Sequence, residues 1–150
     1  MWDYDVVRQG YRAHLGAVPA AIGLSQLQLI DTFIANRQHY CQAYDDRLAH
    51  VEGVRLLGVD WSQISPYIYV IRVRDAQTRS ELMAHLLARG ISSGIHFLGA
   101  HHFSFYQGCR AVSLEVTERV SDQVLTLPLH SFMDAEVIDR VCAAVRSFFC

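Results

Sequence analysis

Three of the chain's eight histidines fall in the stretch "SSGIHFLGAHHFSFYQG" at residues 92–108. These histidines and the aromatic residues among them are His96, His101, His102, Phe97, Phe103, Phe105 and Tyr106. Imidazole side chains can bind a metal ion, transfer a proton or donate a hydrogen bond to a ligand. The spacing of five and then one residue, without an acidic residue between the histidines, matches no metal-binding motif. We therefore expect no metal site here.

His96 is the histidine best placed to contact a ligand. It follows the apolar Ile95 at the predicted C-terminal end of a strand, where ligand-contacting side chains project in many α/β proteins. A histidine there can donate a hydrogen bond to an anionic or hydroxylated ligand. His101 and His102 are instead expected at the surface of a loop or helix end. The residues alone do not decide whether His96 contacts a ligand.

Other common catalytic patterns are missing from the sequence. It has no GxSxG elbow, no recognisable Cys/His signature, no GxGxxG and no Walker A motif. The four cysteines form no CxxC pair, which indicates free thiols. All thirteen basic residues are arginine, so this chain has no side-chain ammonium that could form a Schiff base with a carbonyl cofactor.

The composition indicates one compact domain of 150 residues, or a piece of a larger protein. Hydrophobic residues make up 51% of the chain and the net charge is −2, which favours a folded chain with apolar surface left for a partner. The basic residues are scattered, so nothing marks a nucleic-acid or anionic-membrane binder. No signal peptide or long apolar run is present, and we expect a cytoplasmic protein.

Hydrophobic periodicity predicts an α+β fold with a small, mostly antiparallel sheet and helices on one face. The sequence predicts one long helix, or two joined helices, from Pro19 to about His50. Thr78 and Glu81 form a capping box for a second helix, which Gly90 ends. Asp134 caps the last helix. Extended segments are predicted at 54–59, 66–73, 91–97 and 124–130.

Three collinear stretches then resemble one family. They are "WDYDVVRQGYRAHLGAVPAAIGLSQLQLIDTFIANRQHYCQAY" at 2–44, "RGISSGIHFLGAHHFSFYQ" at 89–107 and "VTERVSDQVLTLPLHSFMDAEVIDRV" at 116–141. The first is similar to the segment after the cofactor lysine in the DegT/DnrJ/EryC1/StrS sugar aminotransferases. The second resembles that family's GI-x-x-x-H-[FY] segment, and looks most like the branch that makes 4-amino-4-deoxy-arabinose on a UDP carrier. The third is similar to the family's L-x-L-P-L run and closing helix.

The resemblance implies the C-terminal small domain of a fold-type I, pyridoxal-phosphate-dependent transaminase. Such an enzyme moves an amino group from glutamate to a keto-sugar nucleotide. Residues 1–50 would be the loop and long helix leading from an absent large domain, and residues 51–150 the small α+β domain. The large domain would carry the Schiff-base lysine, and the resemblance implies dimers with active sites at the subunit boundary.

The resemblance also assigns two candidate contacts. His14 aligns with an asparagine that commonly reaches the neighbouring subunit's cofactor phosphate, and His96 matches a histidine on the substrate side of the pocket. Gly16, Ala17 and Pro19 depart from the family pattern around His14, which puts its cofactor contact in doubt. The stretch at residues 92–108 is thus interpreted as a pocket wall, with Phe97 and Tyr106 packing.

Two functions remain open from the sequence. The chain is either the C-terminal part of a nucleotide-sugar aminotransferase or a non-catalytic truncated relative that acts as a binding, regulatory or oligomerisation module. In both cases we expect no catalytic residue within it and no activity of the chain alone, because it lacks the lysine. Its expected partners are a second copy or a lysine-bearing large-domain chain.

Overall fold

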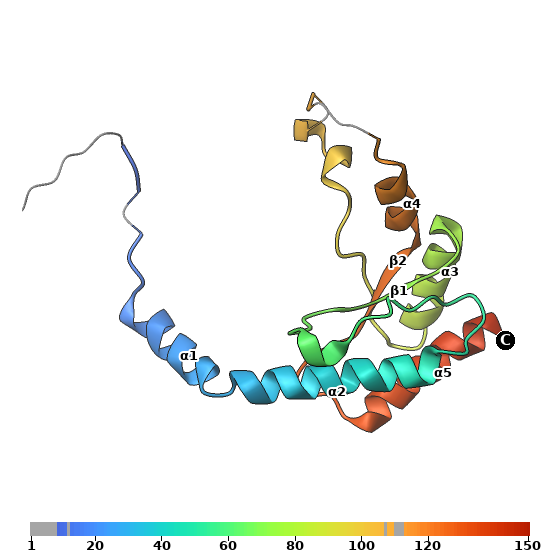
Figure 1. Ribbon diagram of the computed structural model, residues 1–150, viewed down its shortest axis with the longest axis horizontal. Helices are drawn as coiled ribbons and strands as arrows, with labels where there is room; N and C mark the ends of the chain where they lie inside the picture. Colours follow the sequence, from blue (N-terminus) through green and yellow to red (C-terminus); the bar gives the residue numbers. More distant parts are fainter. Residues whose placement is uncertain (1–8, 12, 107, 110–112) are drawn as a thin grey trace, which may run out of the picture. The chain divides into compact units, whose positions relative to one another are not determined.

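The computed structural model describes residues 9–150 except residues 12, 107 and 110–112. The chain divides into two compact units, Met1–Thr32 and Phe33–Cys150, and each is described by itself. The helices labelled in Figure 1, in chain order, are α1 (Ala17–Leu27), α2 (Ile30–Leu48), α3 (Ala76–Leu87), α4 (Glu115–Gln123) and α5 (Ala135–Phe149). The two strands are β1 (Tyr69–Arg72) and β2 (Val124–Leu127), and short 3-10 turns span Trp61–Gln63, Ala100–His102 and Ser104–Tyr106.

The predicted N-terminal helical region is two helices, α1 and α2, rather than one. Pro19 lies in the first turn of α1, where its missing N–H leaves no intrahelical bond unmade. No side chain of α1 is buried. No single helix among the described residues is long and apolar enough to cross a membrane, although α1 and α2 taken as one broken segment meet the same criteria.

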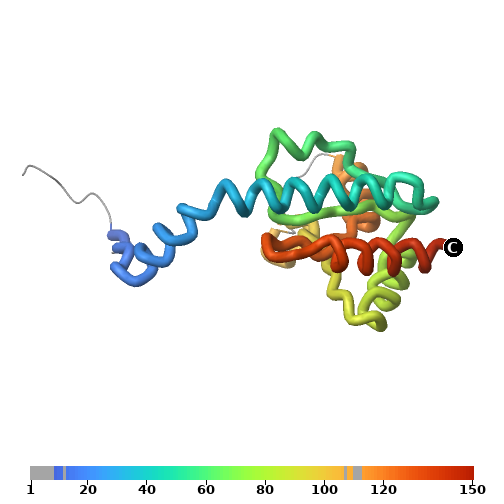
Figure 2. The backbone as a smooth tube through the Cα atoms, turned by 90° about the horizontal axis from the view of Figure 1, so that it is seen from below, coloured from blue at the N-terminus to red at the C-terminus, as the bar shows by residue number. Residues whose placement is uncertain are grey.

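The core of the Phe33–Cys150 unit lies between one face of the sheet and the helices α2, α3 and α5. The antiparallel register pairs Tyr69 with Leu127 and Ile71 with Leu125, so these four buried side chains share a face. The buried helical side chains that pack with them include Cys41, Tyr44, Leu48, Leu82, Leu86, Val141, Cys142 and Val145. Figure 2 shows α2 and α5 running side by side, and Arg47 of α2 forms an ion pair with Asp139 of α5. This architecture confirms the α+β prediction.

The structure confirms two of the predicted helix ends, and a third prediction is wrong. Asp134 caps α5 as predicted, because its carboxylate accepts from the Val137 N–H at 2.8 Å. Gly90 ends the α3 region with a φ of 70°. The Thr78–Glu81 capping box is wrong, because the cap is Asp75, whose Oδ1 accepts from both the N–H and the hydroxyl of Thr78.

Two of the predicted extended segments are not strands. The segment 54–59 contributes only an isolated bridge between Arg55 and Arg72, because Gly53 and Gly58 turn the chain at φ of 90° and 66° on either side. The segment 91–97 contributes only a bridge between Gly94 and Thr126. Both bridges are antiparallel, so they extend the β1–β2 sheet by one residue on each side.

Candidate functional site

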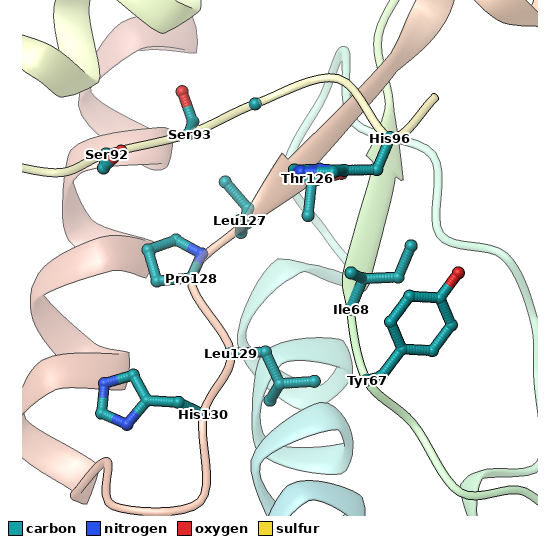
Figure 3. Close-up of a pocket in the computed structure, with 11 residues that line it drawn as sticks. Tyr67, Ile68, Ser92, Ser93, His96, Thr126, Leu127, Pro128, Leu129 and His130 are labelled. Carbon is teal, nitrogen blue, oxygen red and sulfur yellow. The ribbon is translucent and has the colours of Figure 1, made fainter. Parts of the chain in front are cut away.

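The candidate site is a pocket at the end of the sheet where β1 begins and β2 ends. Because Tyr69 pairs with Leu127, the residues before β1 and after β2 meet at this end. The pocket has a volume of about 320 Å³ and is formed by residues 67–68, 92–94, 96 and 126–130. Figure 3 shows its side chains around the tip of β2.

His96 reaches this pocket because of the glycine two residues before it. Gly94 exchanges two backbone hydrogen bonds with Thr126, at 3.1 and 2.8 Å, which fixes the segment beside β2. The His96 ring folds back over Gly94, so that a Cβ at position 94 would lie only 2.9 Å from the ring's Cε1. Glycine therefore makes room for the imidazole, which lies beside Thr126 in Figure 3.

His96 also borders a second pocket on its other side. This pocket has a volume of about 370 Å³ and is mostly apolar, with Phe97, Val116, Val120 and Val124 among its lining residues. His96 is exposed to solvent and so can contact a ligand in either pocket. Both pockets have mostly apolar walls, so the His96 ring is a hydrogen-bonding group that a ligand in either pocket can reach.

Helix α2 fixes the opposite wall of the pocket. Three of its polar side chains, at four-residue spacing, donate to backbone carbonyls of the segment after β2. The pairs are Asn36 with Ser131 at 3.2 Å, Tyr40 with Met133, and Tyr44 with Pro128 at 2.9 Å. Burial raises the pKa of the Tyr44 hydroxyl well above its ordinary value, so it keeps its proton and remains a donor. We call these three side chains the α2 polar ladder.

A second histidine, His130, lines the same pocket and was missed by sequence reasoning. Its Nδ1 accepts a hydrogen bond from the Phe132 N–H at 3.3 Å, so the neutral ring carries its proton on Nε2 as a donor. The pocket thus has two imidazoles and the Thr126 hydroxyl. The only sequence signal for His130 was its place directly after the "LTLPL" run.

The other predicted residues are distributed differently from the sequence interpretation. His14 is exposed in the loop before α1, in the Met1–Thr32 unit, whereas His96 belongs to Phe33–Cys150. Phe97 and Tyr106 were expected to pack, but they are 71% and 45% exposed. Within the described residues, no group of three His, Cys, Asp or Glu side chains is placed to hold a metal ion.

The residues present do not fit the anchoring of pyridoxal phosphate by this chain alone. The cofactor's aldehyde needs a primary amine, and the sequence contains no lysine. The pocket offers imidazoles and hydroxyls, which hydrogen-bond a ligand but do not condense with an aldehyde. This chain therefore cannot hold the cofactor through a side-chain imine.

Comparisons with known proteins agree with this architecture. The family model of the DegT/DnrJ/EryC1/StrS aminotransferase family matches residues 2–146. The solved aminotransferase TlmJ from Streptoalloteichus hindustanus is 29% identical, with a TM-score of 0.86 over 98% of this chain and 40% of that one. S. venezuelae DesV, solved in complex with a ketimine intermediate, is 26% identical, with a TM-score of 0.84 over 98% of this chain and 40% of that one.

The sugar aminotransferase CalS13 from Micromonospora echinospora is 27% identical, with a TM-score of 0.80 over 97% of this chain and 38% of that one. The chain therefore spans about two fifths of the length of these solved proteins.

Proposed function

Because the chain belongs to the DegT/DnrJ/EryC1/StrS aminotransferase family, we propose that it is the C-terminal part of a sugar aminotransferase. In this proposal the His96 pocket forms one wall of the site for a keto-sugar nucleotide. The observation that carries this proposal is that nearly the whole chain matches the family model and aligns with about 40% of the length of a solved aminotransferase.

The proposal assigns binding, rather than carbon–nitrogen chemistry, to this chain. The family is dependent on pyridoxal phosphate, and when bound the cofactor supplies the electron sink for amino transfer. Its Schiff-base lysine must come from a large domain, because these 150 residues contain none. The chain alone is accordingly expected to be inactive.

The pocket side chains suit a hydroxylated ligand. The Nε2–H of His130 donates, the Thr126 hydroxyl donates or accepts, and either nitrogen of His96 hydrogen-bonds a sugar hydroxyl. The α2 polar ladder holds the segment that carries His130, so little ordering of this wall is needed when a ligand binds. His96 is a proposed substrate-binding residue and His14 a proposed cofactor-phosphate contact. An exposed imidazolium at position 14 would donate to phosphate.

The expected partners follow from the same proposal. A lysine-bearing large-domain chain, or a second copy of the complete enzyme, would complete the site. The exposed apolar residues of the Met1–Thr32 unit, such as Leu15, Val18 and Ile22, are suited to such a contact. The cytoplasmic location expected from the sequence stays a prediction.

The proposal is tested by supplying the missing part. The chain is mixed with pyridoxal phosphate, reduced with borohydride and digested for peptide mapping, with and without a lysine-bearing large domain of the family. We expect cofactor attachment and transaminase activity only in the mixture. A side-chain adduct on this chain, or turnover by it alone, would overturn the proposal.

Variants of the chain then test the pocket in that mixture. His96→Ala should raise the KM for the sugar nucleotide. His50→Ala serves as the matched control, because His50 is exposed at the end of α2 and lines neither pocket of His96. Equal KM values for the two variants would contradict a substrate contact by His96.

A second function is favoured by the same missing lysine. A lysine-free relative could pair with an intact aminotransferase as a binding or regulatory module, using the uncovered side chains of α1. Co-purification from the native host separates the two. A large-domain chain without its own small domain supports the enzyme part, whereas an intact aminotransferase supports the module.

A further inference from the structure

A pair of arginines faces each other across the sheet at the end opposite to the His96 pocket. Arg55 and Arg72 exchange two backbone hydrogen bonds, at 2.8 and 2.9 Å. Residues paired in this way place their side chains on the same face of the sheet. Like charges directly opposite each other destabilise a sheet, so the pair calls for a compensating negative charge.

The described residues do not supply that charge. Among them, no carboxylate lies within ion-pair distance of Arg55 or Arg72. Arg72 donates instead to the amide oxygen of Gln123 at 2.6 Å, and its Nε is buried without a hydrogen-bond partner in the described structure. Two guanidinium charges are thus left without an anion.

A pocket of about 540 Å³ is lined by Arg55, though not by Arg72, and shares no lining residue with the His96 pocket. Arg55, Arg74 and Gln123 contribute to its lining, and Glu52 is its one acidic residue. The Gln123 side chain is held at both ends, since its Nε2 donates to the Arg74 carbonyl at 3.0 Å while its oxygen accepts from Arg72. Arg74 is partly neutralised by Asp75, at 2.7 Å.

We propose that Arg55, Arg74 and Gln123 form a binding site for a phosphate-class oxyanion, with Arg72 holding the Gln123 side chain and adding its positive charge. The planar guanidinium donates in a fork that matches phosphate oxygens. A phosphate dianion carries the two negative charges that the unpaired arginines lack, whereas a single carboxylate carries one. Exposed Arg55 closes on the anion from solvent, and Arg72 is positioned by Gln123. This site is independent of the proposed transaminase function.

The test uses the 150-residue chain and inorganic phosphate, followed by NMR titration and calorimetry at low ionic strength. We expect saturable binding, with shifts at residues 52–55, 72–74 and 123. Arg55→Gln should weaken it roughly tenfold or more, the loss expected for one charged hydrogen bond. The matched control is Arg140→Gln, which removes another exposed charge, from α5 outside this pocket, and should change affinity less than about twofold.

Thermal stability gives a second, independent measurement. Without phosphate, Arg55→Gln should not lower the Tm, because it removes a like-charge contact. Phosphate should raise the Tm of the original chain more than that of Arg55→Gln at the same concentration. The proposal is overturned by absence of saturable binding, by equal losses in Arg55→Gln and Arg140→Gln, or by shifts confined to the His96 pocket.

Discussion

Asp45→Ala is predicted to lower the free energy of unfolding by about 3–6 kcal/mol. The Asp45 carboxylate, on α2, accepts from the Trp61 Nε1–H at 2.6 Å and from the Tyr69 hydroxyl at 2.7 Å. Both donors belong to buried residues, with 6% and 1% of their surface exposed. The Tyr69 ring also stacks on Tyr44 at 4.6 Å, so the interaction joins α2 to the start of β1 beside the pocket.

The magnitude follows from counting these two bonds. A hydrogen bond to a charged group contributes about 1.5–3 kcal/mol, and its loss leaves a buried donor unsatisfied. Two such losses sum to about 3–6 kcal/mol, a large part of the roughly 5–15 kcal/mol that holds a domain folded. The stability of Asp45→Asn should lie between those of the original chain and Asp45→Ala. An amide oxygen still accepts one hydrogen bond, but the NH₂ group then faces the other donor.

The neighbouring Asp46 provides the matched control. Asp46 is exposed, and its one donor among the described residues is Gln42 Nε2, one turn earlier, at 2.9 Å. Such a pair contributes about 0.2–0.5 kcal/mol, so Asp46→Ala should be nearly neutral. Urea denaturation followed by far-UV circular dichroism measures both variants. If Asp45→Ala and Asp46→Ala unfold at the same urea concentration, the reasoning about buried donors is wrong.

A double-mutant cycle separates the Tyr69 bond from other effects of removing Asp45. Tyr69→Phe removes one of the two donors, so the loss of Asp45 in that background leaves only one buried donor without an acceptor, in place of two. We expect the double variant to be more stable than the sum of the single losses by about 0.5–3 kcal/mol. Simple additivity would mean that Asp45 and Tyr69 do not stabilise each other.

Further predictions concern the pocket, the thiols and the α3 cap. Gly94→Ala should leave the chain folded, because the added Cβ meets the end of the flexible His96 side chain. It should shift the His96 imidazole NMR signals, and unchanged signals would refute the contact between the His96 ring and Gly94. Burial raises the pKa of Cys41 to about 12 and that of Cys142 to about 11. Iodoacetamide at about pH 8 should therefore modify only the two exposed cysteines of the native chain, Cys109 and Cys150. Equal reaction rates for all four cysteines would contradict this. Because these folded-state pKa values lie above 9.0, the thiols stabilise the fold fully below pH 9.0, and this contribution is lost as the pH rises through about 11 and 12. The backbone hydrogen bond at the start of α3 lowers the pKa of Asp75 from 3.8 to about 2, so its stabilisation is present above pH 3.8 and lost as the pH falls through about 2; Asp75→Asn should remove that step from an acid titration of helicity.

The elements that were predicted correctly carry their signals locally. Asp134 and the apolar series of α5 lie within one segment, and a single periodicity with a single cap defines the helix. The alternation in residues 66–73 likewise marks β1. The α3 cap was misassigned because Asp75 and Thr78 are both good cap residues, and only the backbone geometry shows which one precedes the helix.

The pocket was predictable only in part, because its wall depends on contacts distant in sequence. The motif singled out His96, which lines the pocket, and its contact with a substrate stays a prediction. His130 was not singled out, since its segment is held by side chains of α2 that lie 84–95 residues away, such as Tyr44 and Asn36. Single bridges such as Gly94 with Thr126 also have no local signature, so the segment 91–97 read as a strand.

The absence of lysine would carry little functional meaning if the pocket were also poorly formed. Instead, Gly94 leaves space for the His96 ring, and the buried Tyr44 hydroxyl holds the Pro128 carbonyl on the opposite wall. The proposed binding of a sugar hydroxyl requires donors fixed in position, whereas forming a carbon–nitrogen bond to a carbonyl cofactor requires a primary side-chain amine, which this chain lacks. A well-built pocket without an amine therefore favours a chain that works together with an amine-bearing part over one that has no ligand to bind.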